Sequence, residues 1–200
     1  MNLTQRGIFL FSEGMSAGEL AAAAQHIERL GYGAVWFPEA VGREPVLAAS
    51  FVLANTSKLI AATGIVNIYS RDPMACAMMQ QTLTEQSRGR FLLGLGVSHT
   101  LFVNLRGHDY GKPLATMRGY VDNIAACHKM IAIKTNLAVE GMSEQPLCRD
   151  DDGTLCAPVG AMPIILAALG PKMTALSGEI SQGSHPANTT PEHTAAARAI

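Results

Sequence analysis

The stretch Leu59–Pro73, LIAATGIVNIYSRDP, and its echo Arg90–His99, RFLLGLGVSH, decide the fold of this chain. In each, an apolar run of β-like composition ends near glycine, and polar residues gather where the run stops. This pattern is typical of a parallel strand that is buried on both faces. Because ligands of β/α proteins lie at the carboxyl ends of such strands, we expect the chemistry near Gly64–Asp72 and Gly94–His99.

Strand–helix units continue in both directions from this stretch. Further strands are predicted at Gly7–Phe11, Ala34–Phe37, Pro163–Leu169 and Ser184–Ala187. Helix starts are indicated by a capping box at Ser16–Glu19, by prolines at 45 and 73, by the periodic run Pro113–Ile133, by Gly170-Pro-Lys172 and by Thr190-Pro. The alternation predicts an α/β fold, either an open doubly wound sheet or a (β/α)8 barrel of TIM type. About six strands are indicated, whereas a barrel closes with eight.

Composition limits the classes of protein that remain. With 48% hydrophobic and 16% charged residues, the chain suits a single domain over residues 1–200, with an irregular insertion at 134–162. A net charge of −1 with no basic stripe argues against nucleic acid as a partner. No apolar run is long enough for a membrane span or a signal peptide, so we expect a cytoplasmic protein without a membrane partner. The four cysteines have no CxxC spacing and no metal-binding motif is present, so no metal site is predicted.

Two motifs begin at Gly94 and neither is complete. The run Gly94–His99 starts like a dinucleotide fingerprint but has histidine at the sixth position, and a hydrolase elbow would need glycine at Thr100. Ser98 and His99 nevertheless end a predicted strand, so they are candidates for ligand contact, with a polar loop as the alternative. Glu39 ends the Ala34–Phe37 strand and is a candidate acid or hydrogen-bond acceptor, with a solvated loop carboxylate as the alternative.

Three further features have two interpretations each. Arg71 is either an anion-binding residue or half of a surface ion pair. Gly170-Pro-Lys172 opens a helix whose amides could hold a phosphate, although it is not a Walker A loop. The methionines Met74, Met78 and Met79 at helical spacing indicate core packing or a subunit interface.

These pieces together resemble a known family. In chain order, GIFLF, LGYGAVWFPEA, ATGIVNIYSRDP, SRGRFLLGLGVSH, KPLATMRGYVDNI, PIILAALGPKM and SHPANTTPEHT are similar to the luciferase-like monooxygenase superfamily, and within it to the branch that uses the deazaflavin coenzyme F420. The resemblance implies a (β/α)8 barrel that lacks its last strands, a homodimer, and hydride transfer between coenzyme F420 and an unknown small organic substrate. It also leaves FMN-dependent monooxygenation, or a truncated non-catalytic flavin-binding relative, as alternatives.

The resemblance also implies site residues. The third strand of the family ends in a bulge, often with a non-prolyl cis peptide, that backs the flavin-like ring. Coenzyme contacts are carried over to Gly64, Ile65, Val66, Asn67, Gly96, Val97, Ser98, Ala168, Leu169, Gly170 and Lys172, and catalytic roles to His99 and Glu39. Two departures stand out: Ala40 occupies a position where some members carry a catalytic histidine, and the chain is short of a barrel of ~250 residues.

Overall fold

The computed structural model describes residues 4–136 and 162–200. Its strands are β1 (Gly7–Phe9), β2 (Ala34–Phe37), β3 (Ile60–Thr63), β4 (Val66–Asn67), β5 (Phe91–Gly96), β6 (Ile164–Leu166) and β7 (Gly183–Ser184). Its helices are α1 (Ala17–Arg29), α2 (Pro45–Asn55), α3 (Pro73–Gln86), α4 (Thr100–Leu105), α5 (Pro113–Asn136), α6 (Pro171–Ile180) and α7 (Pro191–Ala197).

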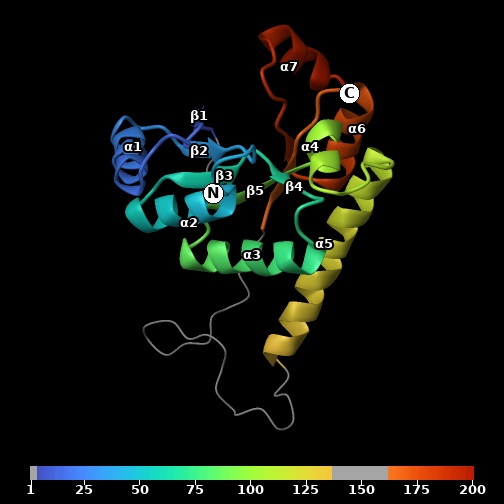
Figure 1. Cartoon of the computed structure of the whole chain (residues 1–200), viewed down its shortest axis with the longest axis horizontal. Helices are drawn as coiled ribbons and strands as arrows, with labels where there is room; N and C mark the ends of the chain where they lie inside the picture. The colour runs from blue at the N-terminus through green and yellow to red at the C-terminus, as the bar shows by residue number, and fades with distance from the viewer. Residues whose placement is uncertain (1–3, 137–161) are drawn as a thin grey trace.

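All strand pairs are parallel, in the order β1-β2-β3-β5-β6-β7, with β4 paired to β5. In Figure 1, α1, α2, α3, α5 and α6 form an arc around this sheet. A doubly wound sheet would carry its connecting helices on both faces. The predicted barrel-type architecture is therefore confirmed, and the described residues form a parallel half-barrel.

The two faces of the sheet are packed differently. The outer face contributes residues such as Val35, Phe37 and Leu93 to a large core that also contains side chains of the surrounding helices. The inner face forms a second, smaller cluster that consists of strand residues alone: Ala34, Trp36, Ile60, Ala62, Leu92 and Ile165. Burial on both faces explains why the sequence shows apolar runs rather than alternation.

The helix starts follow the local sequence as predicted. The backbone N–H of Glu19 donates to Ser16 Oγ at 3.2 Å, and the carboxylate of Glu19 accepts from the backbone N–H of Ser16 at 2.8 Å, which completes the capping box. Pro45 and Pro73 open α2 and α3, where a missing N–H leaves no hydrogen bond unmade. Gly31 follows α1 with φ of 82°, a conformation that glycine adopts without steric cost.

The predicted third strand is in two pieces, because an extra residue lies between β3 and β4. Ala62 pairs with Leu92 and Val66 with Leu95, so three residues on one strand oppose two on the other. This is a β-bulge, and the Gly64–Ile65 peptide within it is cis, as the resemblance implied. The ladder is continued by a side chain: Thr63 Oγ1 donates to the carbonyl of Gly94 and accepts from its N–H, each at 2.8 Å.

Several elements differ from the sequence prediction. Three predicted strands are shorter than expected or shifted, since β1 ends at Phe9, β6 covers Ile164–Leu166 and β7 covers Gly183–Ser184. Helix α4 was not predicted, since its six residues are preceded by His99, which provides no side-chain cap. Helix α5 runs to Asn136, so residues 134–136 are helical rather than part of the predicted insertion. Of the rest of that insertion, Met162 is described and residues 137–161 lie outside the described residues.

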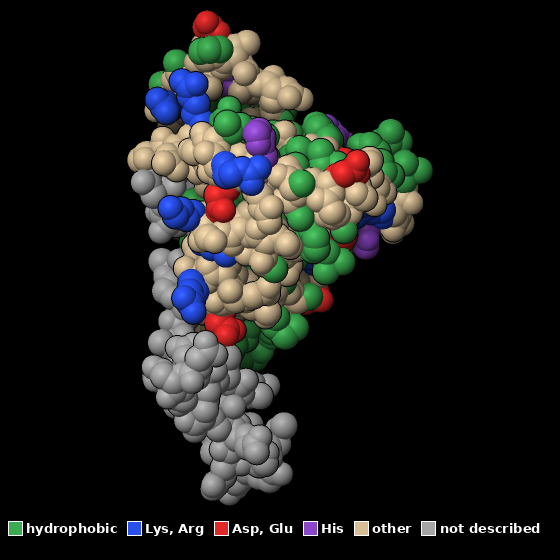
Figure 2. Space-filling view, turned by 90° about the vertical axis from the view of Figure 1, so that its left-hand side faces the viewer, with side chains coloured by type: hydrophobic (Ala, Val, Ile, Leu, Met, Phe, Trp, Pro, Cys, Tyr) green, Lys and Arg blue, Asp and Glu red, His purple; other side chains and the backbone are tan. Residues whose placement is uncertain are grey.

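Two surface observations concern the described residues. None of their helices combines the length and apolar character needed to cross a membrane. On the face shown in Figure 2, basic and acidic side chains are mixed with hydrophobic ones, without a continuous strip of one sign among the described atoms.

Candidate functional site

A cavity of about 810 Å³ lies at the carboxyl ends of the strands. Most of its walls are apolar, as is usual for a small-molecule site. The predicted site residues that line it are Glu39, Gly64, Ile65, Val97, Ser98, His99, Ala168, Leu169, Gly170 and Lys172. The structure therefore brings together segments that follow β2, β3, β5 and β6.

The bulge forms one wall of this cavity. Its backbone is fixed to β2, because the N–H of Gly64 donates to the carbonyl of Phe37 at 2.7 Å and the N–H of Glu39 donates to the carbonyl of Ile65 at 3.2 Å. Glycine at 96 makes room for the bulge, since a Cβ there would lie 2.6 Å from Ile65 Cγ1. Ile65 is thus held between β5 and the cavity.

Three predicted contact residues do not line the cavity. Val66 and Asn67 are buried beneath it, with 0% and 2% exposure. The Asn67 side chain stabilises the turn after β4, because its carbonyl oxygen accepts a hydrogen bond from the N–H of Tyr69 at 3.0 Å. Gly96 lies behind Ile65. These three residues support the wall from below.

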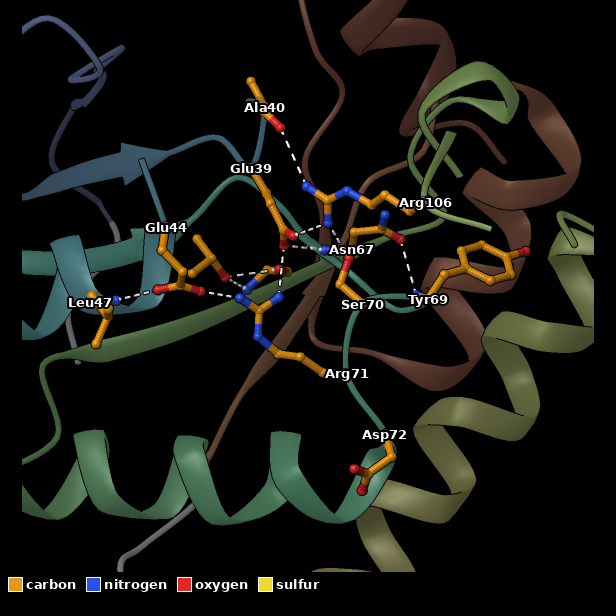
Figure 3. A network of polar contacts seen from close by, with 12 residues as sticks. Glu39, Ala40, Glu44, Leu47, Asn67, Tyr69, Ser70, Arg71, Asp72 and Arg106 are labelled. Atoms are coloured by element: carbon orange, nitrogen blue, oxygen red, sulfur yellow. Dashed lines mark hydrogen bonds and ion pairs between the residues drawn. The ribbon is translucent and has the colours of Figure 1, made fainter. Parts of the chain in front are cut away.

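Glu39 is the centre of an ion-pair network (Figure 3). Its side chain is 8% exposed and lies between two guanidinium groups, at 2.8 Å from Arg71 Nη1 and 2.8 Å from Arg106 Nη1. The backbone N–H of Asn67 also donates to its carboxylate, at 2.9 Å. Arg71 continues the network to Glu44, whose carboxylate caps α2.

This network fixes the charge state of Glu39. Burial alone would raise the pKa of this carboxyl, but the N–H of Asn67 and the guanidinium groups of Arg106 and Arg71 together hold the pKa below its ordinary value. An ionised, fully hydrogen-bonded carboxylate is suited to positioning the loop after β2 and poorly suited to donating a proton. Of the two interpretations of Arg71, the structure shows the ion pair.

The segment after β5 forms a second wall. Ser98 has φ of 56°, in the left-handed region that residues other than glycine seldom occupy. The turn directs the chain into α4, whose Phe102 lines the cavity and contacts the ring of His99 edge-on, with ring centroids 6.1 Å apart. Arg106 at the end of α4 ties this wall to the loop after β2, since it bonds Glu39 and the carbonyl of Ala40, the latter at 3.4 Å.

A third wall comes from the turn between β6 and α6. The N–H of Ala167 donates to the carbonyl of Leu95 at 2.8 Å, which extends the strand ladder into the turn. Gly170 caps α6 without a side-chain hydrogen bond, and the exposed Lys172 lies in the first turn. A helix start of this kind, with a lysine beside it, favours an anionic group.

Sequence reasoning missed other cavity residues, of which His185 is the most polar. Its ring stacks on Trp36, with centroids 4.4 Å apart and an interplanar angle of 23°. The signal was weak because His185 follows β7, a strand of two residues, in a region with no apolar run. Tyr110, Leu114 and Met173 also line the cavity. Leu114 and Met173 lie within motifs quoted for the family resemblance, but none of the three was predicted as a site residue.

Within residues 4–136 and 162–200, no group of three or more His, Cys, Asp or Glu side chains could hold a metal ion. Cys76 is buried, and burial raises the pKa of its thiol to about 11. A thiol of this pKa is protonated at neutral pH, so Cys76 is a packing residue rather than a nucleophile.

Comparison with known proteins identifies relatives. The family model of luciferase-like monooxygenases matches residues 3–200. A Mycobacterium tuberculosis protein, provisionally named a coenzyme F420-dependent oxidoreductase, is 32% identical over 176 residues, which is 82% of this chain and 49% of that protein. The chain spans about half the length of the curated relatives that it matches.

Solved structures share the fold. The coenzyme F420-dependent tetrahydromethanopterin reductase of Methanopyrus kandleri superimposes with a TM-score of 0.70 at 19% identity, over 96% of this chain and 58% of that one. The oxygenating constituent of 3,6-diketocamphane monooxygenase from Pseudomonas putida, in complex with FMN, gives 0.63 at 15% identity, over 90% and 57%. The half-barrel, the bulge and the match over nearly the whole chain lead to one conclusion: this chain belongs to the luciferase-like monooxygenase family.

Proposed function

We propose that this chain binds the deazaflavin coenzyme F420 and takes part in hydride transfer between that coenzyme and a small organic substrate. The observation that carries the proposal is the Gly64–Ile65 bulge, which faces a large apolar cavity at the carboxyl ends of the strands. The F420-dependent name of the relative from Mycobacterium tuberculosis supports it.

The residues of the cavity suit such a coenzyme. A planar heteroaromatic ring needs apolar walls with a few polar groups, and Ile65, Val97 and Phe102 offer such walls. An anionic tail needs a cation or free amides, which the first turn of α6 and Lys172 offer. Glu39 lies in the same cavity, but Arg71 and Arg106 balance its charge, so it does not repel an anion.

The coenzyme, when bound, would supply the carbon that accepts or donates the hydride, and the chain would position the reactants around it. We assign Ile65 and Val97 to ring contact, and Gly170 and Lys172 to the anionic part. His99 is exposed at the cavity rim and can donate to or accept from a substrate oxygen. We assign Glu39 to holding the loop after β2 rather than to proton transfer.

The test is a titration of the purified chain with oxidised coenzyme F420, followed by coenzyme fluorescence, with FMN in a parallel titration. Saturable binding of F420 that Lys172→Ala weakens would support the assignment. Binding of neither coenzyme would refute it. Activity should then be sought by adding candidate alcohols to the loaded protein and following loss of coenzyme absorbance.

FMN-dependent monooxygenation is the second candidate, favoured by the similarity to the structure in complex with FMN. Selective FMN binding, with oxygen uptake on adding reduced FMN and substrate, would replace the first proposal. A non-catalytic flavin-binding role is the remaining alternative, because the chain spans half the length of its relatives. Substrate-dependent reduction of bound coenzyme would exclude it.

We also propose a homodimer, as the resemblance implied. Exposed apolar side chains on α2 and α3, namely Leu47 at 70%, Phe51 at 36% and Met78 at 51%, support an apolar interface on this side. Size-exclusion chromatography with light scattering tests this, since a monomer at high protein concentration would contradict it. The cytoplasmic location stays a prediction.

A further inference from the structure

The imidazole of His185 joins the two ends of the sheet. Strands β1 and β7 are the terminal strands of the order. The backbone N–H of His185 donates to the carbonyl of Leu166 at 2.8 Å, which extends the pairing of β6 with β7 by one residue. Its ring stacks on Trp36 of β2 and on Phe9 of β1, the latter with centroids 6.0 Å apart and an interplanar angle of 20°. The ring therefore crosses the inside of the half-barrel.

The same ring borders the bulge. A Cβ added to Gly64 would lie 3.5 Å from His185 Cε1, and both residues line the cavity. Trp36 packs against the inner strand cluster of Ala34, Ile60, Ala62, Leu92 and Ile165. The imidazole consequently lies on top of this inner layer, where it forms the floor of the cavity next to the Gly64–Ile65 wall.

The surroundings of the ring decide its chemical state. The residues packed against it, Phe9, Trp36 and Gly64, carry no titratable group. Burial lowers the pKa of His185, so the imidazole is neutral at pH 7 and has one donor and one acceptor nitrogen. In the described part of the chain, its one polar partner is its own backbone. His185 is half-buried and lines the cavity, so its other ring nitrogen is left for a ligand in the cavity.

We propose that His185 is a ligand-contacting residue, whose second ring nitrogen forms a hydrogen bond with the polar edge of the heteroaromatic ring bound against the Gly64–Ile65 bulge. This inference rests on the proposed coenzyme binding and adds a specific contact to it. The stack on Trp36 fixes the ring plane, so the nitrogen is oriented before the ligand arrives and little rotamer entropy is lost on binding.

Two substitutions distinguish the contribution of the ring nitrogen to binding from that of the aromatic ring. His185→Phe keeps an aromatic ring on Trp36 but removes the hydrogen-bonding atom, whereas His185→Gln keeps a donor and an acceptor but removes the ring. In titrations with oxidised coenzyme F420, we expect His185→Phe to weaken binding about three- to tenfold, as for the loss of one neutral hydrogen bond. We expect His185→Gln to stay within about threefold of the wild type. Thermal unfolding of both variants checks that they are folded.

A measurement on the unaltered chain covers the case in which a variant does not fold. With 15N-labelled histidine, the ring nitrogens of His185 should shift in NMR spectra when the coenzyme is added, while those of the exposed His26 on α1 should not. Wild-type binding without a His185 shift, or with a folded His185→Phe variant that binds as tightly, would overturn this inference and leave the proposed function intact. Absence of binding to the wild type would overturn both.

Discussion

Replacing Gly96 by alanine tests the packing behind the cavity wall. A Cβ at this position would lie 2.6 Å from Ile65 Cγ1, 2.8 Å from Ile65 Cδ1 and 3.2 Å from Ala167 Cβ. Carbon atoms in contact prefer a separation of about 3.5–4.0 Å, so Ile65 must move by about 1 Å. The backbone of the bulge is held, because the N–H of Gly64 donates to the carbonyl of Phe37 and the N–H of Glu39 donates to the carbonyl of Ile65. The side chain of Ile65 can therefore move chiefly toward the cavity.

The expected magnitude follows from the cost of overpacking a core, which is typically about 1–3 kcal/mol. The clash involves the end of one flexible side chain, so we take about 2 kcal/mol as the loss in free energy of unfolding. For a chain of this size each 1 kcal/mol lowers the melting temperature by about 2–4 °C, which gives a drop of roughly 4–8 °C. Ligand binding should fall by about tenfold or more, because the displaced side chain enters the space that the ligand would occupy.

Thermal unfolding followed by circular dichroism, together with the coenzyme titration, measures both effects. Gly119→Ala is the matched control: it makes the same substitution inside α5, where an added Cβ meets nothing within 4 Å. Alanine is favoured over glycine in a helix by about 1 kcal/mol, so this variant should melt slightly above the wild type and bind ligand normally. A Gly96→Ala protein with unchanged melting temperature and affinity would refute the packing argument.

Three further substitutions test the charges and caps that support the site. Glu39→Gln should cost about 3 kcal/mol of stability at pH 7, because it leaves the guanidinium of Arg71 without its buried partner; urea unfolding measures this. Folding lowers the pKa of Glu39, so its ionised carboxylate stabilises the fold above the unfolded pKa of about 4.3. This stabilisation is lost as pH falls through the folded pKa. The variant should therefore lose less stability in acid than the wild type does. Glu28→Gln should lower the free energy of unfolding at pH 7 by about 1–2 kcal/mol and should likewise lose less stability in acid than the wild type. If variant and wild type lose the same stability in acid, the lowered pKa of Glu28 is contradicted. Ser16→Ala should lower the melting temperature by roughly 2–4 °C through loss of the capping box with Glu19, and no change would show that the cap is dispensable.

The sequence predicted well those features that are set by neighbouring residues. Strand β2 lies at Ala34–Phe37 as expected, and the prolines at 45 and 73 open their helices, because these signals act within a few residues of themselves. The α/β class followed from buried parallel strands at regular intervals, whereas the barrel-type version was implied by the family resemblance. Helix α4 escaped prediction since it is short and has no side-chain cap, so nothing local marks its start.

The sequence predicted which segments form the site, but not which residues contact one another within it. Glu39 was placed at the end of its strand, yet its ion pair with Arg106 joins residues 67 positions apart, and no local pattern encodes that contact. Gly96 was expected to touch the coenzyme, whereas its need for glycine comes from Ile65 in the bulge between β3 and β4. His185 reaches the cavity only because the sheet curves enough to bring its two ends together.

The charge of the site is best understood from the whole network rather than from single residues. Arg71, Arg106 and Lys172 contribute three cations near the cavity, and Glu39 and Glu44 contribute two carboxylates, both of which are paired with arginine. Among the described residues that line the cavity, the cation is Lys172, at the start of α6, whose helix dipole has the same sign at that end. The acid at the end of β2 therefore neutralises its own surroundings, and the field that a ligand meets is positive on the α6 side of the cavity. That asymmetry favours a ligand with an apolar ring at the bulge and a negative charge toward α6, and it disfavours a cationic one.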